Sequence, residues 1–357
     1  MLADRLRRPG TVLLDAPRPD ADTGRRGALL FENPARVVTA STIDEVEPLL
    51  RDLDAALEDG RHVAGFLAYE AGYALEPTRF HNVRQDETVP LGWFGVYDEP
   101  LALGLEDVNA ALPLPAEVGA LAFGYGREDY QVAIDAVRAH IRAGDVYQIN
   151  LTAPLRGPFE GDPLALFARL RDRQQASYGA WIALEGAAIA SVSPELFFRV
   201  DREQGRTITA RPMKGTAPRG TSRATDDQLR DDLQADAKNR AENLMIVDLL
   251  RNDLARVAET GSVRVPALFQ AERYETVTQM TSTVTATLRS EAGLGDVVRA
   301  LFPCGSITGA PKLRAMGVIR DLEVGPRGVY CGTIGYAAPD GTAAFHVAIR
   351  TAVVADG

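Results

Sequence analysis

Cysteine, histidine and long apolar runs are scarce in this sequence, and each shortage excludes a class of protein. Of 357 residues only Cys304 and Cys331 are cysteines, which excludes a disulfide framework and favours a reducing compartment. No stretch approaches the roughly 18 apolar residues of a membrane-spanning helix. The basic start of the chain lacks the apolar run of a signal peptide. We therefore expect a cytoplasmic protein that does not enter a membrane.

Clustered histidines and an excess of positive charge are missing as well. His62, His81 and His140 stand far apart without the spacing of metal ligands, so we interpret each as structural or at the surface. The net charge of −10 argues against binding to nucleic acid or to an anionic membrane. A local basic pocket for a small acid is compatible with that charge.

The chain is long enough for two domains, and its clearer patterning begins after residue 120. We divide it into an N-terminal part, 1–120, and a second region, 121–357. Short strands separated by single helices, without regular β-α-β repetition, predict an α+β fold of antiparallel sheets with helices outside. The stretch 98–120 has little pattern and is interpreted as a linker or an irregular strand.

Apolar spacing and boundary residues place the individual elements. Helices are expected where apolar residues recur at helical intervals between capping and terminating residues, at 42–57, 129–142 and 164–173 and from Pro311 onward. Strands are expected where residues alternate, at 28–31, 63–69, 91–96, 146–151, 179–184, 187–191, 329–336 and 344–354. An acidic helix start at 226–236 runs on into a long helix through residue 253. The threonine-rich stretch 274–288 fits a strand or a helix equally well.

One lysine stands at an unusual place. The alternating stretch 207–210 predicts a strand, and Pro212 ends its regular pairing because proline has no N–H to donate. Gly215 permits a positive φ or a close approach of another group. Lys214 is therefore expected at a strand end beside a bend, where partial desolvation would make its amine a nucleophile. The structural alternative is a surface lysine extending out of a turn.

Three further features carry weaker signals. Glu242 and Asp253 fall on one stripe of the long helix but lie about 16 Å apart along its axis, so they cannot share a metal ion. The Gly-, Ser- and Thr-rich loop 302–312 opens a helix and would suit an anion, although its spacing does not match a Walker loop. Arg350 stands on an otherwise apolar strand, where an unpaired charge is costly, so we expect it to face a carboxylate.

Together these segments resemble the chorismate-utilising enzymes, and most closely the aminodeoxychorismate synthase component I group. The resemblance covers residues 123–357 and implies a fold like that of anthranilate synthase component I, with antiparallel sheets packed face to face. It rests on motifs that occur in the family's order, namely Tyr147-Gln148-Ile149-Asn150-Leu151, Ser193-Pro194-Glu195, Pro212-Met213-Lys214-Gly215-Thr216, the run from Glu242 to Asp253, the loop from Ser306 to Lys312, and Ala348-Ile349-Arg350-Thr351.

The resemblance implies that chorismate is bound with Mg²⁺ and that ammonia from a separate glutamine amidotransferase replaces its 4-hydroxyl. Lys214 matches the family's nucleophile, which attacks ring carbon 2, and Glu195 matches the general acid that helps the hydroxyl leave. Glu242 matches a Mg²⁺ ligand, and one carboxylate combined with substrate oxygens is sound coordination for this cation. Substrate-contact positions are matched by Gly215, Thr216, Tyr330 and Arg350.

Lys214 also separates the relatives within this family. Anthranilate, isochorismate and salicylate synthases usually carry a small residue at that position, so the incoming nucleophile attacks carbon 2 itself. A lysine therefore favours amination at carbon 4, giving 4-amino-4-deoxychorismate for p-aminobenzoate and folate synthesis. The alternatives are an anthranilate synthase component I and an inactive chorismate-binding or regulatory subunit.

Two departures from the family pattern concern the site. Gln279 stands where many relatives have a histidine, and glutamine cannot act as an acid or a base. The family continues past the position of Gly357 with a glycine-rich strand and a glutamate that completes the Mg²⁺ site, and neither is present. We therefore expect these residues to be part of a longer protein.

Overall fold

The chain divides into two compact units. The computed structural model describes residues 1–19, 24, 26–81, 83–114, 118–202 and 205–355. Unit 1 comprises Met1–Ala133, Thr152–Glu195 and Glu323–Gly357, and unit 2 comprises Ile134–Leu151 and Leu196–Leu322. The boundary expected at residue 120 stays a prediction. Gly357, where the sequence pattern departs from the family, lies outside the described residues.

Unit 1 contains a six-stranded antiparallel sheet with a hydrophobic core on each face. In sheet order its strands are β20 (Thr351–Ala355), β11 (Ala187–Ser193), β10 (Tyr178–Ala183), β1 (Thr11–Ala16), β2 (Gly27–Phe31) and β6 (Leu101–Leu103). Along β1, Leu13 enters one core and Val12 enters the other, because successive side chains of a strand point to opposite faces. The sheet is therefore buried on both sides.

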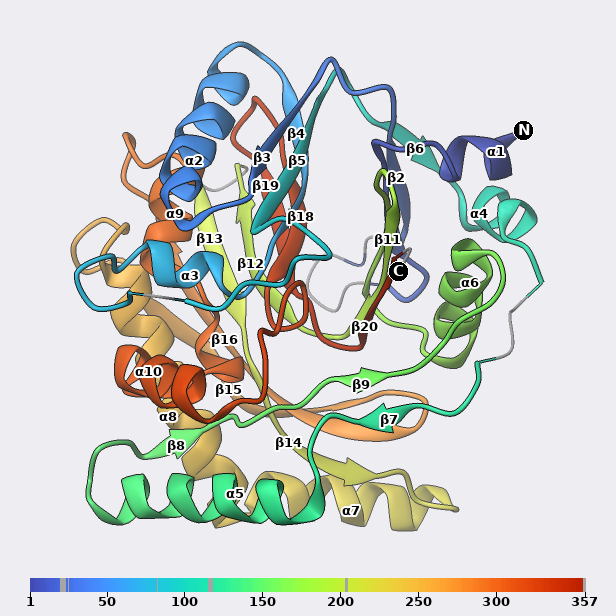
Figure 1. Cartoon of the computed structure of the whole chain (residues 1–357). Helices are drawn as coiled ribbons and strands as arrows, with labels where there is room; N and C mark the ends of the chain where they lie inside the picture. Colours follow the sequence, from blue (N-terminus) through green and yellow to red (C-terminus); the bar gives the residue numbers. More distant parts are fainter. Residues whose placement is uncertain (20–23, 25, 82, 115–117, 203–204, 356–357) are drawn as a thin grey trace. The chain divides into compact units, whose positions relative to one another are not determined.

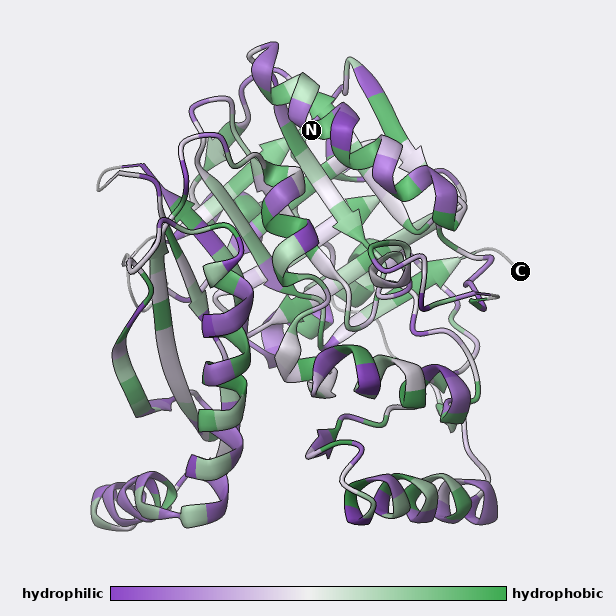
Figure 2. Cartoon of the chain, turned by 90° about the vertical axis from the view of Figure 1, so that its left-hand side faces the viewer, coloured by the Kyte–Doolittle hydropathy of each residue, from purple (hydrophilic) through white to green (hydrophobic). Residues whose placement is uncertain are grey.

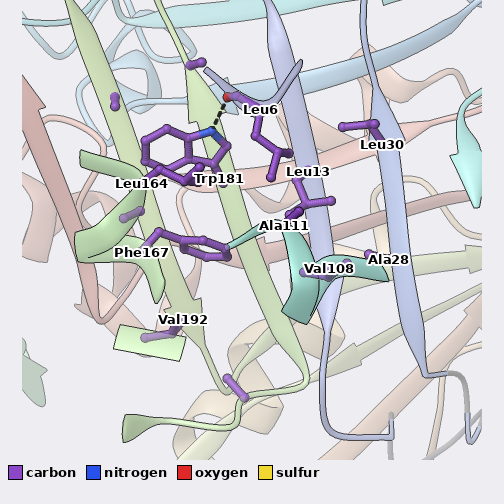
Figure 3. Close-up of a cluster of buried hydrophobic side chains, with 14 residues drawn as sticks. Leu6, Leu13, Ala28, Leu30, Val108, Ala111, Leu164, Phe167, Trp181 and Val192 are labelled. Carbon is purple, nitrogen blue, oxygen red and sulfur yellow. Dashed lines mark hydrogen bonds between the residues drawn. The ribbon is translucent and has the colours of Figure 1, made fainter. Parts of the chain in front are cut away.

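Helices close the first of these cores. They are α1 (Leu2–Leu6), α4 (Leu105–Ala111) and α6 (Pro163–Arg173). Leu6, Val108 and Phe167 bring them onto the sheet beside Trp181 (Figure 3). The indole Nε1–H of Trp181 donates to the carbonyl oxygen of Leu6 at 2.7 Å, so the one polar atom of that buried ring is satisfied.

Five more strands of unit 1 form a second antiparallel set. They are, in order, β19 (Ala343–Val347), β18 (Thr333–Ala337), β4 (His62–Leu67), β5 (Gly92–Tyr97) and β3 (Arg36–Ala40). Among them, β18, β4 and β5 line the second core. Phe66 and Ile334 from these strands share that core with Val12 and Ile182 of the first sheet, so the two sets of strands pack face to face. The remaining elements of this unit's residues are α2 (Ile43–Glu58), α3 (Ala71–Ala74) and the pair β7 (Ala122–Phe123) and β9 (Leu155–Arg156).

Unit 2 is built on a smaller antiparallel arrangement (Figure 1). Its strands run in the order β14 (Met213–Pro218), β16 (Val277–Thr287), β13 (Thr207–Arg211) and β12 (Leu196–Asp201), and β15 (Arg264–Arg273) also pairs with β16. Helices α7 (Arg223–Ala235) and α8 (Ala237–Ala255) pack on β14 and β16. The unit is completed by α9 (Leu294–Leu301), η1 (Gly305–Ile307), α10 (Lys312–Leu322) and the short pair β8 (Gln148–Ile149) and β17 (Gly309–Ala310).

Local signals in the sequence set most helix boundaries correctly. Helix α2 begins after Thr42. It buries a hydrophobic face that includes Leu49 and Leu50, and its other face is polar, so the helix is amphipathic (Figure 2). Asp162 caps α6 by accepting a hydrogen bond from Leu164 N at 3.0 Å. Helix α5 (Arg127–Arg142) covers the stretch expected to be helical. The expected class of antiparallel sheets packed face to face with helices outside is confirmed.

Several sequence-based expectations were wrong. The acidic helix does not run on into the next one, because Asp236 ends α7 and caps α8 by accepting from Asn239 N at 2.7 Å. The stretch 98–120 contains β6 and α4, and its residues 115–117 lie outside the described part. The strand expected at 146–151 is reduced to β8. For the stretch 274–288, which fitted a strand or a helix equally well, the structure selects the strand, β16.

The cysteines and the helices bear on where the protein resides. Cys304 and Cys331 are both buried free thiols. Within the described ranges, no helix combines the length and the apolar character required to cross a membrane. A cytoplasmic location stays a prediction.

Candidate functional site

Lys214 lies in a β-bulge of unit 2. Strand β13 ends at Arg211, and β14 starts after Pro212. Met213 pairs with Thr281 and Thr216 pairs with Gln279, so β14 has one more residue than β16 between these two positions. A bulge of this kind turns a side chain away from the regular alternation. Lys214 is half-buried at this bulge. This agrees with the partial desolvation expected for it from the sequence.

Gly215 is the residue that makes this bulge possible. Its φ is +101°, a conformation that residues with a side chain rarely adopt. A Cβ atom added to it would lie 3.1 Å from Asn239 on α8. The backbone beside Lys214 therefore packs directly on the first turn of α8, and Glu242 follows Asn239 one helical turn later. Sequence reasoning missed Asn239, although its spacing of three residues from Glu242 was a usable signal.

Thr216 and Gln279 contact each other across the two strands. Thr216 Oγ1 donates to Gln279 Oε1 at 3.2 Å. The position where many relatives carry a histidine is thus the direct neighbour of a residue expected to contact substrate. The Gln279 amide can accept and donate hydrogen bonds but cannot take up a proton at neutral pH.

Glu242 fits one specific kind of Mg²⁺ site. Its side chain is 35% exposed and 4.0 Å from Lys238 Nζ, so the carboxylate is accessible from solvent. Among the described residues, no group of three His, Cys, Asp or Glu side chains could hold a metal ion by itself. Mg²⁺ often binds through one or two protein carboxylates together with substrate oxygens and water. Glu242 is therefore compatible with a Mg²⁺ site of this kind, in which substrate and water complete the coordination, rather than with a site made of protein ligands alone.

Asp253, on the same helix, has a different partner. Its carboxylate lies 2.6 Å from Lys312 Nζ, which also donates to the carbonyl oxygen of Leu301 at 2.7 Å. Burial raises the pKa of Asp253, and the neighbouring lysine acts in the opposite direction. The loop before Lys312 is buried, and Thr308 Oγ1 donates within it to Cys304 O at 3.1 Å. This ion pair ties α8 to the start of α10.

Glu195 lies in unit 1, between the end of β11 and the start of β12. Its residue is 3% exposed, its N–H donates to Ser193 Oγ at 3.2 Å, and its carbonyl oxygen accepts from Val347 N at 3.1 Å. These bonds hold the backbone of Glu195 against β19. A carboxyl group kept away from bulk water in this way can hold and deliver a proton to one defined position.

Tyr330 and Arg350 also belong to unit 1, but neither is on a strand. Cys331 and Arg350 have φ of +65° and +52°, which interrupts the long strands expected there. Arg350 is exposed and lies outside the strands, so its expected strand position was wrong, and the carboxylate it was expected to face stays a prediction. Cys331 N donates to Ala348 O and Ala348 N donates to Gly332 O, each at 2.9 Å. The two segments that carry Tyr330 and Arg350 are therefore bonded together.

The expected site residues thus form two groups. The first, in unit 2, contains Lys214, Gly215, Thr216 and Glu242, and the second, in unit 1, contains Glu195, Tyr330 and Arg350. Each group is brought together by hydrogen bonds or packing between segments that are distant in the sequence.

Comparison with known proteins gives this geometry a context. Residues 11–357 match the model of a family described as chorismate binding enzyme. The chain is 42% identical to aminodeoxychorismate synthase component 1 of Escherichia coli (strain K12) over 65% of its own length and 50% of the relative. It is 43% identical to anthranilate synthase component 1 of Streptomyces coelicolor over 62% of its length and 43% of that relative.

The solved structures agree on the fold. Anthranilate synthase component I from Streptococcus pneumoniae TIGR4 superposes with a TM-score of 0.80 at 24% identity, covering 94% of this chain and 86% of that one. The chain spans half or less of the length of the curated relatives named above. Because the family match extends over nearly the whole sequence, the chain belongs to the chorismate binding enzyme family.

Proposed function

We propose that this chain aminates chorismate with ammonia at carbon 4, giving 4-amino-4-deoxychorismate. The observation that carries the proposal is Lys214, a half-buried amine in a β-bulge, in a chain of the chorismate binding enzyme family. Similarity to the aminodeoxychorismate synthase of Escherichia coli supports the same choice. Similarity of almost the same degree to an anthranilate synthase makes 2-amination the alternative.

Two residues carry the covalent steps. The neutral Lys214 amine attacks ring carbon 2 and loses a proton, both ring double bonds shift, and the carbon–oxygen bond at carbon 4 breaks. Glu195 donates the proton with which the 4-hydroxyl leaves as water. Ammonia then attacks carbon 4 and loses a proton, both ring double bonds shift back, and the bond between carbon 2 and Lys214 breaks as the lysine nitrogen takes up a proton. The lysine is regenerated, so the net change exchanges hydroxyl for amine.

The remaining residues bind and orient the substrate. Arg350, which is exposed, offers a planar donor pair for a carboxylate, and Tyr330 offers a hydroxyl. Gly215 and Thr216 supply backbone and hydroxyl contacts beside the nucleophile. Glu242 would hold a Mg²⁺ ion that neutralises substrate carboxylate charge when it is bound. The ammonia source in this proposal is a separate glutamine amidotransferase, in keeping with the relative's name as a component 1.

The test is to incubate the full-length protein with chorismate, Mg²⁺ and ammonium salt and to identify the product by mass spectrometry. We expect 4-amino-4-deoxychorismate. Lys214→Ala should lower its rate of formation at least about 100-fold, which is roughly 2.7 kcal/mol of transition-state stabilisation. Lys238→Ala is the matched control, because that side chain is 83% exposed, and it should retain the wild-type rate.

The alternatives predict different outcomes of the same experiment. Anthranilate, which is fluorescent, as the main product would contradict the proposal and favour an anthranilate synthase. Binding of chorismate without turnover would favour a binding or regulatory subunit. Full activity of Lys214→Ala would refute the covalent role of this lysine while leaving the amination itself in place.

A further inference from the structure

Glu70 holds a distant backbone segment in unit 1. It follows β4, starts α3 and is 3% exposed. Its Oε1 accepts from Arg327 N at 2.7 Å and its Oε2 accepts from Gly328 N at 3.0 Å. In the opposite direction, Tyr69 N donates to Gly328 O at 2.8 Å. Three hydrogen bonds therefore fix residues 327 and 328 to the end of β4.

A buried ion pair fixes the same segment from its other side. The Arg327 guanidinium donates from Nε and Nη2 to the two carboxylate oxygens of Glu323, at 3.0 and 2.7 Å. It also lies 4.3 Å above the ring of Tyr69. Glu323 Oε1 accepts in addition from Thr152 N at 2.8 Å. Both charged side chains are at most 5% exposed, so they are fully committed to this arrangement.

The segment that is held in this way leads directly to Tyr330. Gly328 has a φ of +62°, and Cys331, directly after Tyr330, has a φ of +65°. Beyond Tyr330, the hydrogen bonds to Ala348 tie the segment to the one that carries Arg350. The backbone on either side of Tyr330 is thus fixed at two points, by Glu70 before it and by Ala348 after it.

We propose that Glu70 is a positioning residue for substrate binding, which acts by holding residues 327 and 328 so that Tyr330 and the bonded Arg350 segment face chorismate. This inference rests on the proposed function. Glu70 itself would not touch the substrate. Its carboxylate suits this task because it accepts hydrogen bonds at both oxygens, whereas a neutral amide would place a donor against one of the two N–H groups.

Burial and the neighbouring groups act on the charge of Glu70 in opposite directions. Burial raises the pKa of Glu70 to about 7, although the backbone N–H groups of Arg327 and Gly328 and the Arg327 charge act to lower it. The other titratable groups around it are Tyr69, Tyr73, Glu323 and Cys331. The hydrogen bonds from Arg327 N and Gly328 N and the Arg327 charge thus favour the charged form of Glu70, in which both carboxylate oxygens accept.

The test compares Glu70→Gln with wild type and with Asp15→Asn. Asp15 is an equally buried carboxylate of unit 1, 2% exposed, which is paired with Arg171 rather than with the 327–332 segment. Losing one hydrogen bond to a charged acceptor should raise the KM for chorismate of Glu70→Gln about tenfold, with kcat within about twofold. Asp15→Asn should keep the wild-type KM even if it lowers the unfolding temperature.

Amide hydrogen exchange without substrate provides the second measurement. We expect faster exchange at residues 327–332 in Glu70→Gln and not in Asp15→Asn. Unchanged exchange there would overturn the inference whether or not chorismate binds. Faster exchange with an unchanged KM would reduce Glu70 to a structural residue and also overturn it. Failure of wild type to bind chorismate would instead contradict the proposed function, on which the inference depends.

Discussion

The three lysines of the chain occupy three different environments. Lys238 is largely exposed, and the side chain of Lys312, which is 11% exposed, forms an ion pair with Asp253. Lys214 is half-buried and lies at the bulge, where no salt bridge in the described part of the chain includes it. Its burial could be anticipated from Pro212 and Gly215, which are local signals. The bulge itself could not, because it depends on pairing with residues more than 60 positions away.

This scarcity makes a covalent intermediate easy to assign. With chorismate and without ammonia, attack by Lys214 and loss of the 4-hydroxyl should leave an adduct that is heavier by chorismate minus one water. We expect peptide mass spectrometry to place it on the peptide containing Lys214 and to find none in Lys214→Ala. The peptides containing Lys238 and Lys312 serve as internal controls. An adduct on either of them instead would contradict the assignment.

Glu242 can be tested separately from the nucleophile. Glu242→Gln removes the negative charge but keeps the shape, so the concentration of Mg²⁺ at half-maximal activity should rise about tenfold or more, because Mg²⁺ strongly prefers charged oxygen ligands. Asp248→Asn on the same helix is the control, since that carboxylate is 60% exposed and pairs with Arg251. An equal shift in both variants would indicate a general charge effect rather than a ligand.

At the scale of elements, the contact between β14 and α8 organises the first group of site residues. Gly215 occupies a positive φ and would meet Asn239 if it had a Cβ atom. Gly261, in the same unit, has a φ of +77°, and a Cβ atom added to it would meet nothing within 4 Å, so the two glycines differ mainly in that contact. Substitutions at these two glycines therefore form a matched pair, whose difference in stability measures how much the close contact between β14 and α8 matters.

Gly215→Ala should therefore lower the free energy of unfolding more than Gly261→Ala. Each loses about 1 kcal/mol from the unfavourable φ, and Gly215→Ala should lose roughly 1 kcal/mol more by overpacking against Asn239. Urea unfolding followed by circular dichroism measures the difference. The rate of adduct formation at Lys214 should fall only in Gly215→Ala. Equal effects of the two substitutions would show that the contact with α8 does not matter.

Elements that depend on neighbouring residues were predictable, and those that depend on distant ones were not. Thr42 and Asp162 mark helix starts by chemistry that acts within a few residues, and the helices expected at 42–57 and 164–173 are present as α2 and α6. Asp236 carries the same kind of signal, but it lies in an acidic run that fits one continuous helix equally well. The interruptions at Cys331 and Arg350 left no local trace, because neither residue type is typical of a positive φ.

At the scale of the whole molecule, seven expected site residues are supplied by two compact units, each through contacts that no local pattern encodes. Glu70 shows most clearly that such contacts cannot be predicted from local sequence, since its partner Arg327 is 257 positions away. Recognisable motifs indicated which residues matter. Only the folded chain shows which side chains hold them in place.

Unit 1 also contains two buried groups that respond to pH in opposite directions. The raised pKa of Glu70, about 7 against 4.5 in the unfolded chain, adds stability below pH 4.5 that is lost as the pH rises to 7. Burial lowers the pKa of His346 to about 3, so its contribution is present above pH 6.5 and is lost as the pH falls. Between pH 7 and 5 the two effects nearly cancel.

Replacing Glu70 with Gln should therefore leave the pH dependence of stability that comes from His346 without its opposing contribution. Both tryptophans, Trp93 and Trp181, lie in unit 1, so their fluorescence during urea unfolding reports on this unit. From pH 7 to 5, the free energy of unfolding of wild type should change little. That of Glu70→Gln should fall by about 2 kcal/mol, because His346 binds a proton only in the unfolded chain. The same pH dependence in both proteins would mean that Glu70 does not titrate in this range, and that its carboxylate stays charged while it holds the segment before Tyr330.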